Sequence, residues 1–378
     1  MAEVAGNAPL VDLRQTGRLP GAGSLPVNRR KFLRTCACLT LTGAAPALLS
    51  CHAACRRKTP PPAPAAPRAV NFEASYLALH SSGELAKRGE ALWDMMASCQ
   101  LCPRRCGAKR IDGEEGFCRA SSALEISGFS PHFGEEAPLV GKGGSGTIFL
   151  TNCTLRCVFC INWETSQGGD GVVRSIDDMA DMMLSLQDTG CHNVNMVTPT
   201  HYSPHIVLAL DRAASKGLTV PVVWNTCGWE RLEILQILDG IVDIYLPDYK
   251  YSDGKMAAKY SSTAEDYPDV ARAALLEMNR QAGVAKPPLS GLMQRGLMIR
   301  HLVMPNDVSG SGEVMRWIGA NLPKDTYVNI MSQYRPMYKA HDHEEIARPI
   351  TRDEYHVVVQ TARKAGLTNL EIQGYPLS

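Results

Sequence analysis

Residues 153–160 of the chain read Cys-Thr-Leu-Arg-Cys-Val-Phe-Cys, and the fold is interpreted from this stretch outward. It places three thiols directly after residues 147–150, an apolar run with β-branched side chains. Thiols at spacings of four and three residues cannot all lie on one face of a strand, so we predict a loop wrapped around one metal centre. Three thiolates leave a four-iron cluster one ligand short. The open iron of such a cluster can bind a substrate or cofactor directly.

Phe159 precedes the last cysteine, and with it the loop resembles the cluster loop of the radical S-adenosylmethionine (SAM) enzymes. The resemblance implies that Cys153, Cys157 and Cys160 hold a [4Fe-4S] cluster and that SAM binds its open iron. It also implies an electron donor such as a flavodoxin or ferredoxin, and reductive cleavage of SAM to a 5′-deoxyadenosyl radical that abstracts hydrogen from a substrate. A zinc knuckle or half of a disulfide framework is the alternative.

The other cysteines are also clustered, which favours metal sites over a disulfide scaffold. A complete set of four precedes the loop, at Cys99, Cys102, Cys106 and Cys118. Four thiols can close a metal site by themselves, holding either structural zinc or a second iron-sulfur cluster, and a structural metal is slightly favoured. Cys191 and Cys227 stand alone and are expected to be buried apolar thiols.

Charge is unevenly distributed along the chain. The net charge is +1, but residues 1–58 hold nine Lys and Arg against two acidic residues, which leaves about −6 for the remainder. A net negative charge on residues 59–378 is unlike the basic surface of a nucleic-acid binder, so no nucleic-acid partner is expected. No apolar run approaches the roughly 20 residues of a membrane span.

Residues 1–58 are predicted to be a leader. Residues 28–34, Asn-Arg-Arg-Lys-Phe-Leu-Arg, resemble a twin-arginine export signal, and residues 48–51, Leu-Leu-Ser-Cys, resemble a lipoprotein cleavage box. Export with a lipid anchor on Cys51, the only expected contact with a membrane, is therefore favoured. A basic extension of a cytoplasmic enzyme is the alternative. Residues 59–70, almost entirely Pro and Ala, read as a stiff tether.

The remaining chain reads as an α/β protein. Residues 71–122 are predicted to form a helical hairpin, broken at Ser82-Gly83, and the four-cysteine segment; residues 123–378 are predicted to form a barrel. After a short strand at 124–128, six strands are expected at 147–152, 193–197, 219–224, 242–246, 297–303 and 326–331. Helices are expected at 176–187, 204–215, 230–238, 264–281, 312–322 and 351–365, the first capped by Ser175. This alternation predicts a parallel sheet in a partial (β/α)6 barrel.

Polar residues follow the ends of the predicted strands, where α/β barrels build their active sites. Those proposed to contact SAM are Thr198, Thr200, His201, Asn225 and Thr226. Those proposed to handle SAM or substrate as catalytic residues are Asp248, Lys250, Arg300 and His301. An arginine inside a barrel needs an anion partner, and SAM supplies a carboxylate. The alternatives are that His201 caps or packs a helix and that Asp248 and Lys250 form a screened ion pair.

Several motifs narrow the resemblance to the radical SAM branch related to pyruvate formate-lyase activating enzymes. They are the segments at 99–106, 144–149, 197–201, 224–228, 243–250, 300–305 and 333–336. This branch implies a glycyl-radical protein as partner. One departure is that residues 198–201, Thr-Pro-Thr-His, stand where most radical SAM proteins carry a Gly-Gly-Glu that holds the SAM amino group. The rival class is a non-catalytic iron-sulfur or zinc protein that transfers electrons or binds a partner.

Overall fold

The computed structural model describes residues 72–285 and 291–374. The predicted leader at 1–58 and tether at 59–70 lie outside these residues. Export by the twin-arginine route and the lipid anchor on Cys51 therefore stay predictions.

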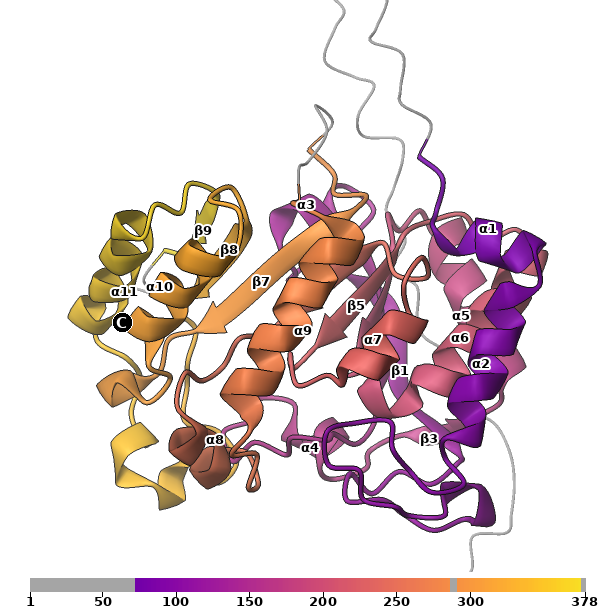
Figure 1. The fold of residues 1–378 in the computed structure, drawn as a ribbon, viewed down its shortest axis with the longest axis horizontal. Coiled ribbons are helices and arrows are strands. Elements are labelled where there is room, and N and C mark those ends of the chain that lie inside the picture. Colours follow the sequence, from indigo (N-terminus) through magenta and orange to yellow (C-terminus); the bar gives the residue numbers. More distant parts are fainter. Residues whose placement is uncertain (1–71, 286–290, 375–378) are drawn as a thin grey trace, which may run out of the picture. The chain divides into compact units, whose positions relative to one another are not determined.

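A nine-stranded sheet forms the centre, in the order β3-β1-β2-β4-β5-β6-β7-β8-β9 (Figure 1). Its strands are β1 (Leu124–His132), β2 (Ser145–Leu150), β3 (Val172–Arg174), β4 (Val194–Val197), β5 (Val222–Thr226), β6 (Ile244–Pro247), β7 (Gly296–Leu302), β8 (Tyr327–Met331) and β9 (Leu370–Ile372). All neighbours from β2 to β9 are parallel, whereas β1 runs antiparallel to both β2 and β3. Because β3 and β9 are the two ends of the order, the sheet stays open. The predicted α/β fold with a partial barrel is confirmed.

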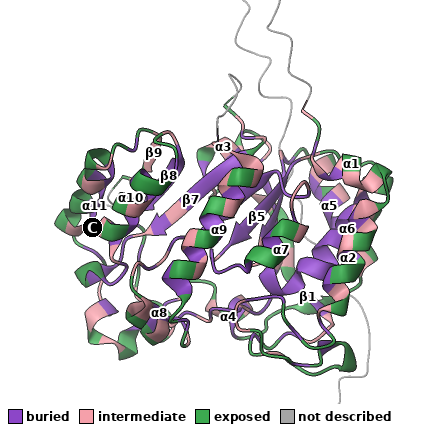
Figure 2. Ribbon diagram, viewed as in Figure 1, coloured by how far each residue is buried: buried purple, intermediate pink, exposed green. Residues whose placement is uncertain are grey.

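The six predicted barrel strands correspond to β2 and β4 through β8. Ile148 of β2 lies in register with Met196, Trp224 and Tyr245 of the next three strands, and all four side chains are fully buried. Burial on both faces is expected where helices cover a parallel sheet, and it explains the continuous apolar runs. Figure 2 shows the buried strands behind helices whose outer faces are exposed.

Helices connect these strands and cover the sheet. They are α5 (Ile176–Asp188), α6 (Ser203–Ser215), α7 (Leu232–Ile237), α8 (Gly254–Tyr260), α9 (Tyr267–Ala282), α10 (Ser311–Asn321) and α11 (Arg352–Lys364). The predicted cap of α5 is confirmed: Ser175 Oγ accepts from the Asp178 amide at 3.0 Å, and the Asp178 carboxylate accepts from the Ser175 amide at 2.8 Å. Only α8 of this set was not predicted from the sequence.

The predicted helical hairpin is present as α1 (Tyr76–Ser81) and α2 (Glu84–Asp94). Gly83 makes the break with φ +73°, a conformation that side-chain-bearing residues rarely adopt. Helix α2 packs against α6 at close range, since a Cβ on Gly89 would lie 2.7 Å from Leu208 Cδ2. The hairpin is therefore attached to the outer layer of the sheet.

At the edges of the sheet, the structure contains one strand that is longer than predicted and several short elements that were not predicted. Strand β1 continues to His132, four residues past the predicted end at 128, because it pairs with β2 through Ser145. The short β3 and β9 and the helices α3 (Ala137–Val140) and α4 (Trp163–Ser166) were not predicted. Segments of three or four residues are held by tertiary pairing and show no usable periodicity.

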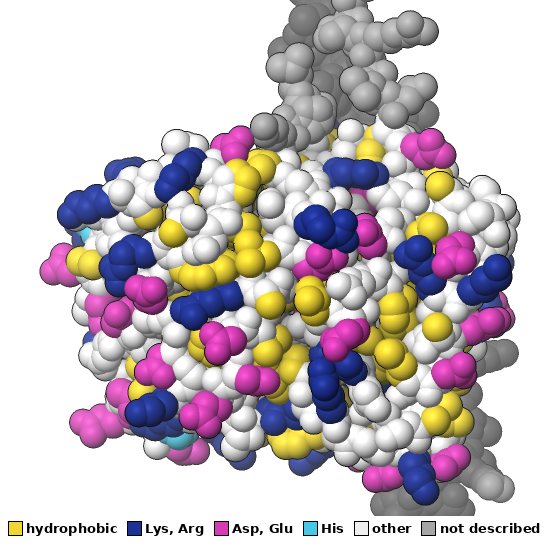
Figure 3. Space-filling view, viewed as in Figure 1, with side chains coloured by type: hydrophobic (Ala, Val, Ile, Leu, Met, Phe, Trp, Pro, Cys, Tyr) yellow, Lys and Arg dark blue, Asp and Glu magenta, His cyan; other side chains and the backbone are white. Residues whose placement is uncertain are grey.

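The surface in Figure 3 carries acidic and basic side chains interspersed over the face of α7 and α9. Among the helices of residues 72–285 and 291–374, none combines the length and apolar character needed to cross a membrane. The carboxyl ends of β2 and β4–β8 converge on the loop that carries the three clustered cysteines.

Candidate active site

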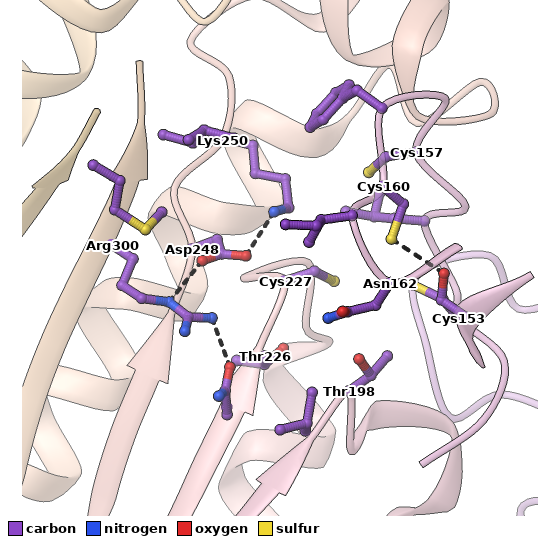
Figure 4. A pocket seen from close by; sticks show the side chains of 18 of the residues that line it. Cys153, Cys157, Cys160, Asn162, Thr198, Thr226, Cys227, Asp248, Lys250 and Arg300 are labelled. Carbon is purple, nitrogen blue, oxygen red and sulfur yellow. Dashed lines mark hydrogen bonds and ion pairs between the residues drawn. The ribbon is translucent and has the colours of Figure 1, made fainter. Parts of the chain in front are cut away.

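The loop after β2 brings Cys153, Cys157 and Cys160 to one cavity of about 270 Å³ (Figure 4). Asn152 and Arg156 turn the loop with φ values of +70° and +51°. The amide of Val158 donates to the Tyr260 carbonyl at 2.9 Å, which fixes the loop to the end of α8. The three thiols therefore face a shared space, as the spacing predicted.

Two of these sulfurs already have polar partners. Ser261 Oγ donates to Cys157 Sγ at 3.0 Å, and Cys160 Sγ lies 3.2 Å from Ser166 Oγ. Burial raises the pKa of the Cys157 thiol to about 12 even though Lys250 lowers it. Because iron is ligated by thiolates, metal binding here must release protons.

Six predicted residues line the same cavity: Thr198, Asn225, Thr226, Asp248, Lys250 and Arg300. They come from the carboxyl ends of β4, β5, β6 and the interior of β7. Thr198 has φ +61° and its amide donates to the Asn225 carbonyl at 2.9 Å, so it lies at the turn directly after β4. The strand ends therefore assemble as the barrel prediction requires.

Asp248 lies at the centre of a buried ionic chain. It accepts from Lys250 Nζ at 2.6 Å through Oδ2 and from Arg300 Nε at 2.9 Å through Oδ1. Arg300 Nη2 continues the chain by donating to Asn225 Oδ1 at 2.6 Å. Burial alone would raise the pKa of Asp248, but the two cations hold it below its ordinary value. The carboxylate thus stays charged and fixes both cations at the cavity wall (Figure 4).

Two glutamates that were given no role from the sequence support this chain from the opposite end of the strands. Glu135 Oε2 lies 3.5 Å from Arg300 Nη1, and Glu135 Oε1 accepts from Asn225 Nδ2 at 3.4 Å. Glu136 is buried and accepts from Asn329 Nδ2 at 2.9 Å. Burial, together with Glu136, raises the pKa of Glu135 to about 7 in spite of Arg300. An adjacent acidic pair was visible in the sequence, but no local pattern places it beneath a barrel.

We expect Glu135→Gln to flatten the pH dependence of stability. The folded state raises the pKa of Glu135 from 4.5 to about 7, so the folded protein holds this proton more tightly than the unfolded chain does. This contribution is fully present below pH 4.5 and is lost as the pH rises through 7. Urea unfolding of the parent and the variant between pH values of about 5 and 8 measures the difference.

Glu115→Gln is the matched control for this prediction, since Glu115 lies exposed on the surface. It should keep the slope of the parent. If Glu135→Gln keeps that slope as well, the group that titrates lies elsewhere.

Three predicted site residues point away from the cavity, and their roles are corrected here. Thr200 Oγ1 donates to Glu230 at 2.7 Å. His201 Nε2 donates to the Thr151 carbonyl at 2.8 Å, and burial lowers the pKa of this histidine to about 3. His301 Nδ1 donates to the Tyr249 carbonyl at 2.6 Å, and burial lowers its pKa to about 4. These side chains bond to the surrounding scaffold, and only Nδ1 of His201 is buried among them without a hydrogen-bond partner in the described residues.

Thr226 is shared between the scaffold and the cavity. Its hydroxyl donates to Glu230 Oε1, as do Thr200 Oγ1 and Trp224 Nε1, at 2.5, 2.7 and 3.3 Å respectively. Glu230 is fully buried, and burial raises its pKa despite these three donors. With its proton committed to Glu230, Thr226 can offer a bound molecule only an acceptor oxygen.

Further polar residues line the cavity without having been predicted, among them Cys227, Asn162, Ser166 and Tyr334. Cys227 was expected to be a buried apolar thiol, but it faces the cavity beside Lys250, and that prediction is corrected (Figure 4). Its position directly after Thr226 was a usable signal. Asn162 also lines the cavity, and nothing in the sequence marked it. Cys191 is buried, as expected.

The upstream cysteines form a second cluster of thiols. The Cys99 amide donates to the Ala108 carbonyl at 2.9 Å, which folds the chain back so that Cys99 and Cys106 become neighbours. A Cβ on Gly116 would lie 3.3 Å from Cys106 Sγ and 3.6 Å from Cys118 Sγ. Within the described ranges, no three His, Cys, Asp or Glu side chains surround a single ion-sized point. The metal predicted for this set stays a prediction.

Comparison with known proteins links the chain to one superfamily. Residues 147–259 match the family model described as the Radical SAM superfamily. An uncharacterized protein of Methanocaldococcus jannaschii, MJ0674, is 31% identical over 307 residues, covering 79% of this chain and 83% of that protein.

Two solved structures are also similar. Methylornithine synthase has a TM-score of 0.37 at 12% identity, covering 58% of this chain and 67% of that one. A radical SAM methyltransferase from Sphaerobacter thermophilus has a TM-score of 0.41 at 13% identity, covering 81% of this chain and 97% of that one.

Proposed function

Because the chain belongs to the radical SAM superfamily, we propose that Cys153, Cys157 and Cys160 hold a [4Fe-4S] cluster and that SAM is cleaved in the adjoining cavity. The observation that carries this proposal is that the three thiols share one cavity with Asp248, Lys250 and Arg300. The donor set fits the cofactors. Thiols suit iron, and the charged and hydroxyl groups suit a zwitterionic ligand.

Held by Cys153, Cys157 and Cys160, a cluster would supply the electron for reductive cleavage of SAM to methionine and a 5′-deoxyadenosyl radical, which would take a hydrogen atom from the substrate. The chain's own residues bind and orient the cofactors, and they keep water out of the cavity. Leu155, Phe159, Leu302 and Met331 supply apolar walls to the cavity. A dry wall protects a reactive species from side reactions.

The ionic chain is suited to the carboxylate of SAM. Arg300 donates hydrogen bonds from Nε to Asp248 and from Nη2 to Asn225, and its Nη1 lies 3.5 Å from Glu135. Lys250 contacts Asp248 through one of its three ammonium protons, which leaves the others for an incoming anion. Asp248 holds both cations in place, so it acts as a positioning residue.

For the finer activity we propose an activating-enzyme-like role, in which the hydrogen atom is removed from a glycyl-radical-type protein. This proposal rests on the sequence motifs shared with the branch of pyruvate formate-lyase activating enzymes. An electron donor of flavodoxin or ferredoxin type would supply the electron. Mixing the protein with SAM, reductant and a candidate glycyl-radical protein, then recording the electron paramagnetic resonance spectrum, tests this role.

The central expectation is that anaerobically reconstituted, dithionite-reduced protein releases 5′-deoxyadenosine and methionine from SAM in equal amounts, measured by liquid chromatography and mass spectrometry. Cleavage of one carbon–sulfur bond per electron requires this equality. Protein reconstituted without iron and sulfide is the control and should release neither product. An iron-loaded protein that leaves SAM intact would favour the rival class of non-catalytic iron-sulfur proteins.

A further inference from the structure

We propose that Cys99, Cys102, Cys106 and Cys118 hold a second metal centre, a tetrathiolate of net negative charge that is neutralised by Arg110 and fastened to the first cysteine loop by Arg104. The class of ligand is a thiophilic metal, either one zinc ion or one iron-sulfur cluster. The metal-binding part of this proposal does not depend on SAM cleavage. The role of Arg104 rests on the proposed function.

Arg110 provides the first argument, because it is a buried cation without a carboxylate partner. Its side chain is fully buried. Nε and Nη2 donate to the Ser121 carbonyl at 3.0 and 2.7 Å, and Nη1 donates to the His201 carbonyl at 2.8 Å. In the described part of the chain no Asp or Glu forms an ion pair with it. Among its hydrogen bonds within the described residues, the one to a thiol is Nη1 to Cys99 Sγ, at 3.9 Å.

A guanidinium cannot lose its proton in a protein, so this charge must be balanced. The effective penalty for an unbalanced buried ion is several kcal/mol. Four neutral thiols would leave Arg110 unbalanced. Four thiolates around a zinc ion carry a net charge of about −2 and supply the missing counter-charge. Arg110 therefore points to a thiolate centre at this position.

The backbone around the four cysteines provides the second argument. The amide of Gly107 donates to the Cys99 carbonyl at 3.0 Å, and the amide of Arg105 donates to the Cys102 carbonyl at 3.0 Å. Gly107 and Arg105 have φ values of +70° and +43°, so two tight turns reverse the chain around the thiols. Cys106 is the exposed member of the set. Loading the site would draw the thiols together, and Cys106 has the most room to move.

Arg104 connects this centre with the loop that carries the other three cysteines. Its Nε donates to the carbonyl of Thr154, the residue after Cys153, at 2.9 Å, and Nη2 donates to the Ser262 carbonyl. The neighbouring Ser261 donates its hydroxyl to Cys157 Sγ at 3.0 Å. The guanidinium also lies 3.7 Å from the ring centroid of Phe117, next to Cys118. One side chain thus touches neighbours of cysteines from both sets.

Metal analysis of the full-length triple variant Cys153→Ser/Cys157→Ser/Cys160→Ser tests the second centre. We expect about one zinc ion, or one cluster's iron and sulfide, to remain per chain, and the additional change Cys118→Ser to remove it. Zinc and iron-sulfur each support the proposal and identify the metal. A triple variant that folds, as judged by circular dichroism, yet holds neither metal would overturn it.

Because the triple variant could fail to fold, Cys118→Ser is also made in the otherwise unchanged chain. It should lose one centre's worth of metal relative to the parent while keeping the iron of the first loop. Identical metal content in parent and variant would refute a second centre, whatever the outcome of SAM cleavage.

Arg104→Gln tests the connection between the two sites. We expect it to retain the second metal but to lower the iron affinity of the first loop by about tenfold, the lower end of the effect of outer partners on metal ligands. A global structural defect would instead lower both metals together. Arg105→Gln, at the exposed neighbouring position, is the matched control and should bind both metals like the parent. Unchanged iron affinity in Arg104→Gln would contradict its positioning role.

Discussion

Replacing Cys157 with alanine should lower the release of 5′-deoxyadenosine from SAM to the level of a protein-free control. Cys157 is the middle thiol of the loop and is buried, with Ser261 donating to its sulfur at 3.0 Å. With two thiolates left, a four-iron cluster has two open irons and is no longer held firmly enough to accept and deliver an electron. Anaerobic turnover followed by chromatography of the nucleoside measures the loss.

Cys191→Ala is the matched control for Cys157→Ala, because Cys191 is also a buried thiol but does not line the cavity. It should release 5′-deoxyadenosine at the parental rate. Iron analysis completes the comparison, since Cys157→Ala should lose the iron of the first loop only. If Cys157→Ala cleaves SAM as well as the parent does, the assignment of the loop as the cluster site is wrong.

The assembly of this cavity could be predicted because it depends on regular elements. Six apolar strands, each followed by a helix, require a parallel sheet, and the carboxyl ends of parallel strands lie at one edge. Residues next to those ends, such as Asn225, Thr226 and Asp248, therefore had to come together. Predicting that these residues come together required no knowledge of individual side-chain contacts.

The orientation of single residues could not be predicted in the same way. Arg300 and His301 are consecutive on β7, so their side chains must point to opposite faces. Both residue types are plausible in an active site, and an apolar strand buried on both faces gives no sign of which one faces the barrel interior. The structure directs Arg300 into the cavity and His301 toward Ser311. His201 is directed away from the cavity in the same manner.

The positions of Glu135 and Cys227 in the site could not be predicted from the sequence either. Glu135 precedes α3 and reaches Arg300 across 165 positions of sequence, through a segment of irregular backbone. No local pattern encodes such a contact. Cys227 follows β5 within a turn, where the backbone direction decides whether a thiol faces the core or the cavity. Both are features that tertiary packing decides.

Asp248→Asn should destabilise the folded protein by about 3 kcal/mol, because it leaves the buried cations Lys250 and Arg300 without their shared counter-charge. We take the lower end of the range for a broken buried pair, since the Lys250 and Asp248 side chains are 17% and 13% exposed. The folded state lowers the pKa of Asp248, so its stabilisation is present above the unfolded value of 3.8 and is lost at lower pH. Urea unfolding near neutral pH therefore measures the full effect.

Asp181→Asn is the matched control for Asp248→Asn, because the ion pair of Asp181 with Lys216 has a similar length of 2.7 Å but side chains that are 67% and 44% exposed. Solvent screens that pair, so its loss should change the free energy of unfolding by less than about 1 kcal/mol. The double variant Asp248→Asn/Lys250→Met should recover part of the loss, because it removes one of the two uncompensated cations. Equal effects of Asp248→Asn and Asp181→Asn would show that the cavity is wet enough to screen its charges. In that case water exclusion could not be a property of this site.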